Sequence, residues 1–378
     1  MTNTITNVLG KLLADGVLAL RQNAVFPRLV NRDYEALARE KMGNVINVPI
    51  PSAIAARAVT PSVVMNSNVA SAPTVALITL DHWYEAPFEA SDNDVASMSP
   101  TFFPMQASEA IKALGNDADS YGLGKAAGVY QFVGAAGTTP FASGVTLATT
   151  ARKQLNIGLA PMDNRFVIYD PSAEANFLAS PNIIQANFRG NAGAITAADP
   201  GTVLGFQWYM DQNVATVTPG VGWVTGWAAS TVSAAVGDTT LNIINATASG
   251  TVLVGDIFTS GSGTYVITKA ATASATVALA ITFTPALATG INTGAAITVL
   301  GTAYTANLAA NKYAFAWASR PLAGSLVDGH VFQAPTDPIS GIALRLELSR
   351  QYKLETMSYD YLAGAGLIRP SLALKILG

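Results

Sequence analysis

The sequence predicts an α+β fold, in which a body of alternating helices and strands carries an inserted all-β segment. In the body, stretches with apolar residues three and four apart alternate with short β-type runs. From Pro219 to Gly301 the composition shifts to Thr, Ser, Val, Ala, Ile and Gly, with Gly-Asp turns between short β runs. Near the end, Ile342–Tyr361 contains no Gly or Pro and begins with strict apolar–polar alternation, which predicts one strand about 60 Å long.

The composition indicates that much of the surface is buried against other protein. Charged residues make up 12% of the 378-residue chain, against about 25% in ordinary globular proteins. Hydrophobic residues make up 50%, and the mean hydropathy is +0.33. No stretch offers the roughly 20 continuous apolar residues that a membrane-spanning helix needs. We therefore expect large interfaces between copies of the chain, because interface cores are depleted in charge.

Residue counts exclude several classes of function. The chain has no cysteine, which excludes disulfides and thiolate metal sites. A net charge of −3 and a pI near 5.4 argue against a nucleic-acid binder that works by neutralising phosphates. The first 20 residues lack a basic start followed by an apolar core, so they do not resemble a signal peptide. These features fit an intracellular product that relies on packing.

The N-terminal region predicts helices followed by a long hairpin. Asn31 is placed to cap a helix over residues 32–42, which Gly43 would end. The runs Val45–Pro51 and Thr74–Glu85 then predict two extended arms. The tip between these arms, residues 52–72, has too few large apolar residues to pack by itself, so we expect it to lean on another surface.

A long helix is predicted after the hairpin. Its apolar residues form a single stripe with spacings of three and four, from residue 104 to residue 123, which gives a helix about 30 Å long. The stripe consists of Ala107, Ile111, Leu114, Ala118 and Tyr121.

Catalytic and metal-binding patterns are scarce. The two histidines are His82 and His330, and no Gly-x-Ser-x-Gly motif accompanies them. Gly122–Gly128 lacks the strand and the hydroxyl residue of a phosphate-binding loop. Asp117 and Asp119 have calcium-loop spacing, but a glycine stands where the closing glutamate belongs. We therefore predict no catalytic, cofactor-binding or metal site.

In their order and spacing, six stretches resemble the major capsid proteins of tailed bacteriophages, which share the Hong Kong 97-like fold. The likeness is strongest to the branch typified by short-tailed phages of Salmonella, whose coat protein carries an inserted β domain. The stretches are FPRLVNRDYE, VINVPIP, LDHWYEAPFEASDND, GTVLGFQWYM, NLAANKYAFAWASRPL and LRLELSRQYKLETMSYDYLAGAGLIRPSLALKI.

The resemblance implies a division of the chain and a function. Residues 1–44 would form the N-terminal arm, 45–90 the extended-loop hairpin, 91–140 the peripheral domain with its spine helix, 141–218 and 302–340 the two parts of the axial domain, 219–301 the inserted β-barrel-like domain, and 341–378 the C-terminal strands of the peripheral domain. The chain would be a major capsid protein that assembles into the icosahedral shell around the double-stranded DNA of a tailed phage. It would be no enzyme and would need no cofactor.

The resemblance also implies partners. The chain would bind itself in hexamers and pentamers, meet a portal protein at one vertex, and enclose double-stranded DNA without sequence specificity. No membrane would be a partner. There is no lysine between Met42 and Ile111, so covalent crosslinking from the extended loop is not expected. No long helical prefix precedes the arm, which indicates a separate scaffolding protein. The protein would lie in the virion and assemble in the host cytoplasm.

Six residues are candidate intersubunit contacts. They lie in the charged N-terminal stretch, at the hairpin tip and at the base of the second arm: Arg28, Arg32, Glu35, Arg57, Trp83 and Glu85. The charged stretch is equally compatible with a solvated amphipathic helix. Arg57 is the one charge in the tip. It would meet a carboxylate of an adjacent subunit, or else remain in solvent.

Three alternatives remain open from the sequence. One is a cellular encapsulin-like nanocompartment shell of the same fold. A second is a secreted β-rich surface-layer or adhesin module, which the helical body and the N-terminal stretch disfavour. A third is a hydrolase that uses one of the two histidines.

Overall fold

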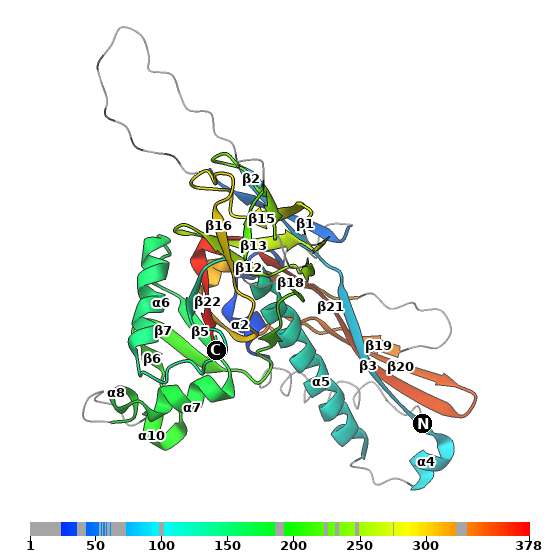
Figure 1. The fold of residues 1–378 in the computed structure, drawn as a ribbon. Helices are drawn as coiled ribbons and strands as arrows, with labels where there is room; N and C mark the ends of the chain where they lie inside the picture. Colours follow the sequence, from blue (N-terminus) through cyan, green and yellow to red (C-terminus); the bar gives the residue numbers. More distant parts are fainter. Residues whose placement is uncertain are drawn as a thin grey trace.

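The computed structural model describes residues 24–35, 43–52, 73–97, 102–185, 193–222, 226–230, 234–245, 249–274, 276–322 and 331–378, together with residues 54, 56, 58 and 61. Within these residues, a mixed α+β body carries a separate β-barrel and a two-stranded hairpin (Figure 1).

One half of the body is a seven-stranded sheet. Its strands are β4 (Phe132–Gly134), β5 (Arg165–Tyr169), β6 (Thr202–Val203), β7 (Phe206–Met210), β8 (Thr216–Val217), β17 (Tyr304–Asn311) and β22 (Ala373–Leu377). The order is β4-β22-β17-β5-β7-β6, and β8 pairs with β17. Every residue of β5 and β22 is buried, as expected for apolar strands at the centre of a covered sheet.

Short helices surround this sheet: α6 (Thr146–Ile157), α7 (Pro171–Ala179), α8 (Pro181–Ile184) and α10 (Gly193–Ala197). The buried side chains of α6 and α7 join the same core as the sheet. Asp170 begins α7, because its carboxylate accepts the backbone N–H of Ser172 at 3.0 Å and Pro171 follows at the first helical position.

The other half of the body is built on long strands. They are β3 (His82–Ser91), β18 (Phe315–Arg320), β19 (Val331–Gln333), β20 (Leu344–Gln351) and β21 (Leu354–Leu367). Along one edge β21 pairs with β3, from Leu354↔Ser91 to Ala363↔His82. Along its other edge it pairs first with β20 and then with β18.

The single strand expected over Ile342–Tyr361 is wrong, because the chain folds back in the middle of it. β20 and β21 form a hairpin with Gln351 opposite Leu354. The two turn residues, Tyr352 and Lys353, have φ of 37° and 62°. That conformation suits a two-residue hairpin turn, which usually carries Asn or Gly, so neither residue signals it. The length expected of one strand is shared between two.

Helix α5 (Phe102–Gly124) follows the predicted stripe and crosses beside β3 and β21 (Figure 1). Ala107, Ile111, Leu114 and Ala118 are buried in the main core with Tyr359 and other residues of β21, while Tyr121 is half-buried. Before it lies α4 (Asp92–Ser97), and after it come three short 3-10 turns along the chain: η1 (Lys125–Gly128), η2 (Lys312–Ala314) and η3 (Pro370–Leu372).

A glycine of α5 admits the N-terminal segment. Helix α2 (Phe26–Leu29) packs its buried Phe26 against α5 at Gly122. A Cβ at Gly122 would lie 2.1 Å from Phe26 Cδ1, whereas a Cβ at Gly124 would meet nothing within 4 Å. Gly122 lowers the helix propensity of α5, but its missing side chain makes room for this packing.

The two expected arms form a hairpin of β1 (Val45–Ile50) and β2 (Thr74–Thr79), paired from Val45↔Thr79 to Ile50↔Thr74. The second arm is shorter than expected. β2 ends at Thr79, and the buried Leu80 lies between β2 and β3, outside both strands. One face of the hairpin, with Ile46 and Ile78, packs on β18 and β21. On the other face Leu77 is 61% exposed.

The segment rich in Thr, Ser and Gly contains a closed six-stranded barrel. It consists of β9 (Trp227–Ala229), β10 (Thr240–Ile244), β12 (Ile257–Ser260), β13 (Gly263–Lys269), β15 (Leu279–Thr284) and β16 (Ala296–Val299). A two-stranded ribbon of β11 (Gly250–Val252) and β14 (Ala271–Ala273) accompanies it. The barrel has its own apolar core, separate from that of the body. Closure leaves no free strand edge in the barrel wall.

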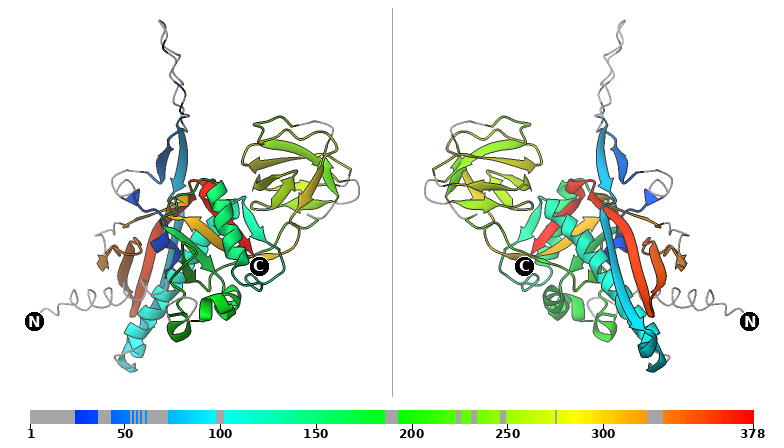
Figure 2. Two further views of the ribbon diagram at one scale, coloured as in Figure 1. Left: turned by 90° about the vertical axis from the view of Figure 1, so that its left-hand side faces the viewer. Right: turned by 90° about the vertical axis from the view of Figure 1, so that its right-hand side faces the viewer.

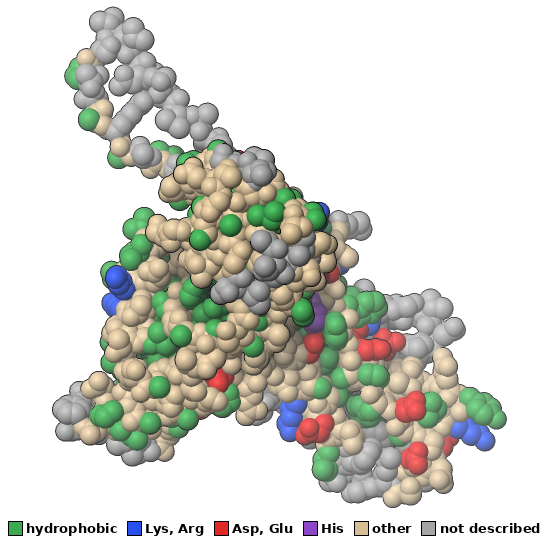
Figure 3. Space-filling model, in the orientation of Figure 1, with side chains coloured by type: hydrophobic (Ala, Val, Ile, Leu, Met, Phe, Trp, Pro, Cys, Tyr) green, Lys and Arg blue, Asp and Glu red, His purple; other side chains and the backbone are tan. Residues whose placement is uncertain are grey.

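The molecule is extended. The barrel, the hairpin and the far end of α5 project from the body in different directions (Figure 2). In one view, charged side chains gather near α4, β3 and the β20–β21 hairpin, while much of the remaining surface is apolar or neutral (Figure 3). Among the described helices, none has the length and apolar character needed to cross a membrane.

Gly122→Ala should destabilise the unassembled subunit by about 2 kcal/mol, because the new methyl group overlaps the buried ring of Phe26. Gly124→Ala, on the same helix, should be neutral or stabilising by up to about 1 kcal/mol. Urea unfolding followed by circular dichroism measures both. Equal effects of the two substitutions would show that α2 does not require this close approach.

Candidate intersubunit contact residues

The three N-terminal candidates belong to a segment that is fixed to the body by its backbone. Phe26 and Val30 are buried. The N–H of Asn31 donates to the carbonyl oxygen of Phe315 at 3.2 Å, and the N–H of Trp317 donates to that of Asn31 at 2.9 Å. This anchoring fixes the segment beside β18 and leaves Arg28 exposed.

Arg32 and Glu35 are engaged within the subunit. Arg32 Nη1 lies 3.9 Å from Glu35 Oε1, and Arg32 Nη2 donates to the carbonyl of Pro338 at 3.3 Å. Gly341, with φ of 73°, lies directly beside them, and a Cβ there would come within 2.0 Å of Glu35 Oε1. The pair therefore seals the contact between the N-terminal segment and the turn before β20.

The buried carboxyl group of Asp119 holds the start of α2. Its oxygens accept the N–H groups of Val25, at 2.9 and 3.0 Å, and of Phe26, at 2.8 Å. Burial, followed by repulsion from Asp211, raises the pKa of Asp119 to about 8, and the two backbone donors and Arg28 oppose that rise. The positive charge of Arg28 thus lies close enough to Asp119 to lower the pKa of this buried carboxyl group.

Trp83 and Glu85 lie on one face of β3, two residues apart. Trp83 is 62% exposed, and its indole N–H donates to Asp360 Oδ2 at 2.9 Å. Glu85 is also exposed and accepts a hydrogen bond from the Ser358 hydroxyl at 3.1 Å. The structure brings these two candidates together on one patch.

An ion pair lies beneath that patch. Arg345 Nε donates to Asp360 Oδ1 at 2.8 Å, and its Nη2 also contacts Asp360, so the pairing is bidentate. Asp360 is 2% exposed. The hydrogen bonds that Arg345 donates to Asp360 raise the pKa of Arg345, and the neighbouring carboxylates Glu347 and Glu85 act in the same direction. The pair fixes β20 against β21 under Trp83.

The six candidates do not form one site. Arg28, Arg32 and Glu35 belong to the N-terminal segment, and Trp83 and Glu85 belong to the face of β3. Arg57 lies outside the described residues, as does His330. The role of all six as contacts between subunits stays a prediction.

A polar cluster that local sequence patterns do not indicate joins α5 to the long strands. His82 Nε2 lies 2.7 Å from Asp117 Oδ2, and the Tyr361 hydroxyl donates to the same oxygen at 2.6 Å. The imidazole is stacked between the rings of Tyr84 and Tyr121, at centroid distances of 4.2 and 3.9 Å. In the sequence, the signal for this cluster is Asp117, an acidic residue beside the apolar stripe of the predicted helix. Its partners His82 and Tyr361 are distant in the sequence.

The described residues include no group of three or more His, Asp or Glu side chains that could hold a metal ion. In the cluster around His82, Asp117 contacts the imidazole and the Tyr361 hydroxyl, while a second carboxylate, Asp81, accepts the hydroxyl of Tyr121 at 2.9 Å. The geometry of the cluster serves to join elements, through stacking and short hydrogen bonds.

The stability of the unassembled subunit should fall as pH rises toward 8, in part through Asp119. The folded state holds this proton up to pH about 8, while the unfolded chain releases it near pH 3.8. The contribution of Asp119 to the free energy of unfolding is therefore complete below pH 3.8 and is lost by the time the pH has risen through about 8. Between these values the free energy of unfolding falls by at most about 1.4 kcal/mol per pH unit. Asp119→Asn keeps an acceptor oxygen and should flatten this slope. Urea unfolding at a series of pH values measures it, and an unchanged slope in the variant would contradict the assignment.

Asp360→Ala should lower the free energy of unfolding by about 3 kcal/mol, because it removes the buried carboxylate that pairs bidentately with the half-buried guanidinium of Arg345. The matched change Asp92→Ala removes an exposed pair with Arg350 and should cost less than about 1 kcal/mol. Thermal and urea unfolding of both variants give the comparison. A small effect of Asp360→Ala would mean that water reaches Arg345 freely.

Comparisons with known proteins identify the fold. No family model matches the chain, and no curated protein matches it. Among solved structures, one from Mycobacterium phage Che8 has a TM-score of 0.52 at 14% identity and covers 93% of this chain and 90% of that one. The capsid of cyanophage P-SCSP1u has a TM-score of 0.52 at 14% identity, with 94% and 88% covered. The capsid of Ralstonia phage GP4 has a TM-score of 0.50 at 8% identity, with 92% and 86% covered. At these identities the likeness concerns the fold, and the chain has the fold of tailed-phage capsid proteins.

Proposed function

We propose that the chain is the major capsid protein of a tailed bacteriophage and assembles into an icosahedral shell around double-stranded DNA. The observation that carries the proposal is the capsid fold, which extends over 92–94% of the chain in the three comparisons above. A likeness of that extent includes the body and most of its projections.

The physical properties of the subunit support the proposal. Its charge is low, at 12% of residues, and its projections leave apolar side chains in solvent. On the hairpin, Val45, Val75 and Leu77 are 47%, 57% and 61% exposed on one face. Neighbouring subunits in a shell would cover such surfaces, because apolar burial is the main favourable term in association.

We assign the parts of the Hong Kong 97-like fold as follows. The hairpin of β1 and β2 is the base of the extended loop, α5 is the spine helix, and the seven-stranded sheet forms the axial domain. The barrel of β9 to β16 is the inserted β domain. The domain boundaries predicted from the sequence stay part of this proposal.

The partners follow from the same role. The chain binds itself in hexamers and pentamers, a separate scaffolding protein guides assembly, and a portal protein occupies one vertex. DNA is enclosed without sequence-specific contacts, and the protein becomes part of the virion after assembly in the host cytoplasm.

Negative-stain electron microscopy of the purified chain, alone and with the scaffolding protein of the same phage, tests the proposal. We expect closed shells whose formation increases with protein concentration and salt, since apolar contacts dominate. A monomer under all these conditions would overturn the proposal. Particles isolated from cells that hold protein cargo and no nuclease-resistant DNA would indicate a nanocompartment instead.

A further inference from the structure

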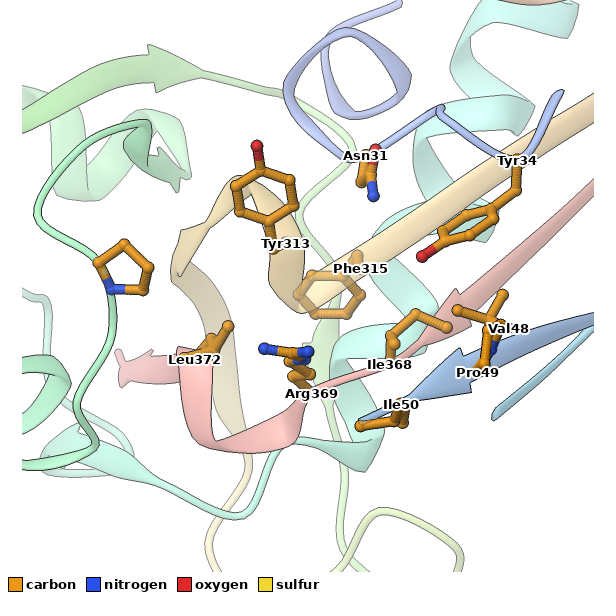
Figure 4. Close-up of a pocket in the computed structure, with 11 residues that line it drawn as sticks. Asn31, Tyr34, Val48, Pro49, Ile50, Tyr313, Phe315, Ile368, Arg369 and Leu372 are labelled. Atoms are coloured by element: carbon orange, nitrogen blue, oxygen red, sulfur yellow. The ribbon is translucent and has the colours of Figure 1, made fainter. Parts of the chain in front are cut away.

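We propose that a groove at the base of the hairpin is a docking site for a second copy of the chain, which inserts an apolar side chain and places a carboxylate against Arg369. This inference rests on the proposed function and identifies one contact by which the subunits would join. The groove has a volume of about 140 Å³ and lies between β1, the segment after α2, and the residues around η2 and η3 (Figure 4).

The floor of the groove is apolar and buried. Phe315 is fully buried, Val48 is 1% exposed and Leu372 is 6% exposed. In Figure 4 the rings of Tyr34 and Tyr313 stand on either side of Phe315. A cavity of about 150 Å³ lined by apolar side chains accepts a group of the size of benzene. The groove is therefore of the size to accept one large apolar side chain.

A cation without a partner lies over this floor. The guanidinium of Arg369 lies close to Leu372 and Phe315 (Figure 4). Its backbone N–H donates to the carbonyl of Ala314 at 3.0 Å, which fixes the residue in position. In the part of the chain that the structure describes, no carboxylate lies within ion-pair distance of it. A guanidinium beside apolar rings is suited to bidentate pairing with a carboxylate.

Exposed apolar side chains lie at the groove and, in the chain, next to Pro161, which lines it. Tyr313 is 42% exposed, and close to Pro161 in the chain Leu159 and Met162 are 88% and 70% exposed. Leu159 also has φ of 55°, a left-handed conformation that is unfavourable for a leucine.

The occupant is a second copy because the chain itself carries the complementary chemistry. Its acidic residues outnumber its basic ones, 24 to 21. On β3, the exposed Trp83 and Glu85 show that its surface pairs a large apolar side chain with a carboxylate. A groove on one copy that receives a different segment of the next makes a heterologous contact, the type that builds rings.

The charge of Arg369 provides the first test. Arg369→Glu should reduce shell formation at least tenfold in light-scattering assays while leaving the circular dichroism of the subunit unchanged, and Arg369→Lys should retain part of it. Lys269→Glu is the matched control, because Lys269 is an exposed cation on the barrel and is not among the residues that line the groove. Wild-type shells together with normal shells from Arg369→Glu would overturn this inference and leave the proposed function standing. Failure of the wild-type chain to form shells would overturn both.

A second test keeps Arg369 intact and uses the absence of cysteine from the chain. Tyr313→Cys places a single thiol in the groove, and Lys269→Cys places one on the barrel as control. Maleimide should label Cys at position 313 in the subunit, and assembly should slow this labelling at least tenfold, with the control little changed. A photoreactive label at position 313 should crosslink to a second copy of the chain. Unchanged labelling in shells, or a crosslink from position 313 to a different protein instead of a second copy, would overturn the proposal.

Discussion

Burial of one face of α5 against β3 and β21 is the interaction on which the rest of the molecule depends. The apolar stripe of the helix supplies most of the contact, and the stacked His82 with its bond to Asp117 fixes the helix along the strands. Because β3 and β21 run antiparallel over ten residue pairs, they form a stiff base that a single helix can cover. The N-terminal segment, the hairpin and β18 are all attached to this base.

Elements with a regular local pattern could be predicted from the sequence. The stripe of α5 has the helical period, and the run that forms β1 has the composition of a strand, so both elements were predicted from the sequence. The turn at Tyr352 and Lys353 could not be predicted, because the backbone of both residues is left-handed, a conformation that usually carries Asn or Gly in such turns. Local pattern is informative where local energetics decide the backbone, and here the pairing of β20 with β21 decides it.

The contacts of the candidate residues depended on the fold and were beyond local pattern. Asp117 meets His82 and Tyr361, which are 35 and 244 residues away. Trp83 meets Asp360 across the sheet, and the groove below Arg369 is made by five separate parts of the chain. Trp83 and Glu85 were predicted from the sequence as candidate contacts between subunits. The guanidinium that lies near them belongs to Arg345, on another strand. Such groups are identified only when the long-range pairing of strands is known.

The position of β22 has a consequence for the order of folding. This strand lies between β4 and β17 in the seven-stranded sheet, and it pairs with β4, whose residues come about 240 positions earlier in the chain. The sheet therefore stays incomplete until β22 has been synthesised, whereas the barrel pairs only within its own residues and can fold sooner. Contacts so distant in sequence form slowly, since loop closure must precede them. A nascent subunit would then leave β4 without its partner strand for most of its synthesis, and chaperones that shield such edges would govern how much of it reaches the native state.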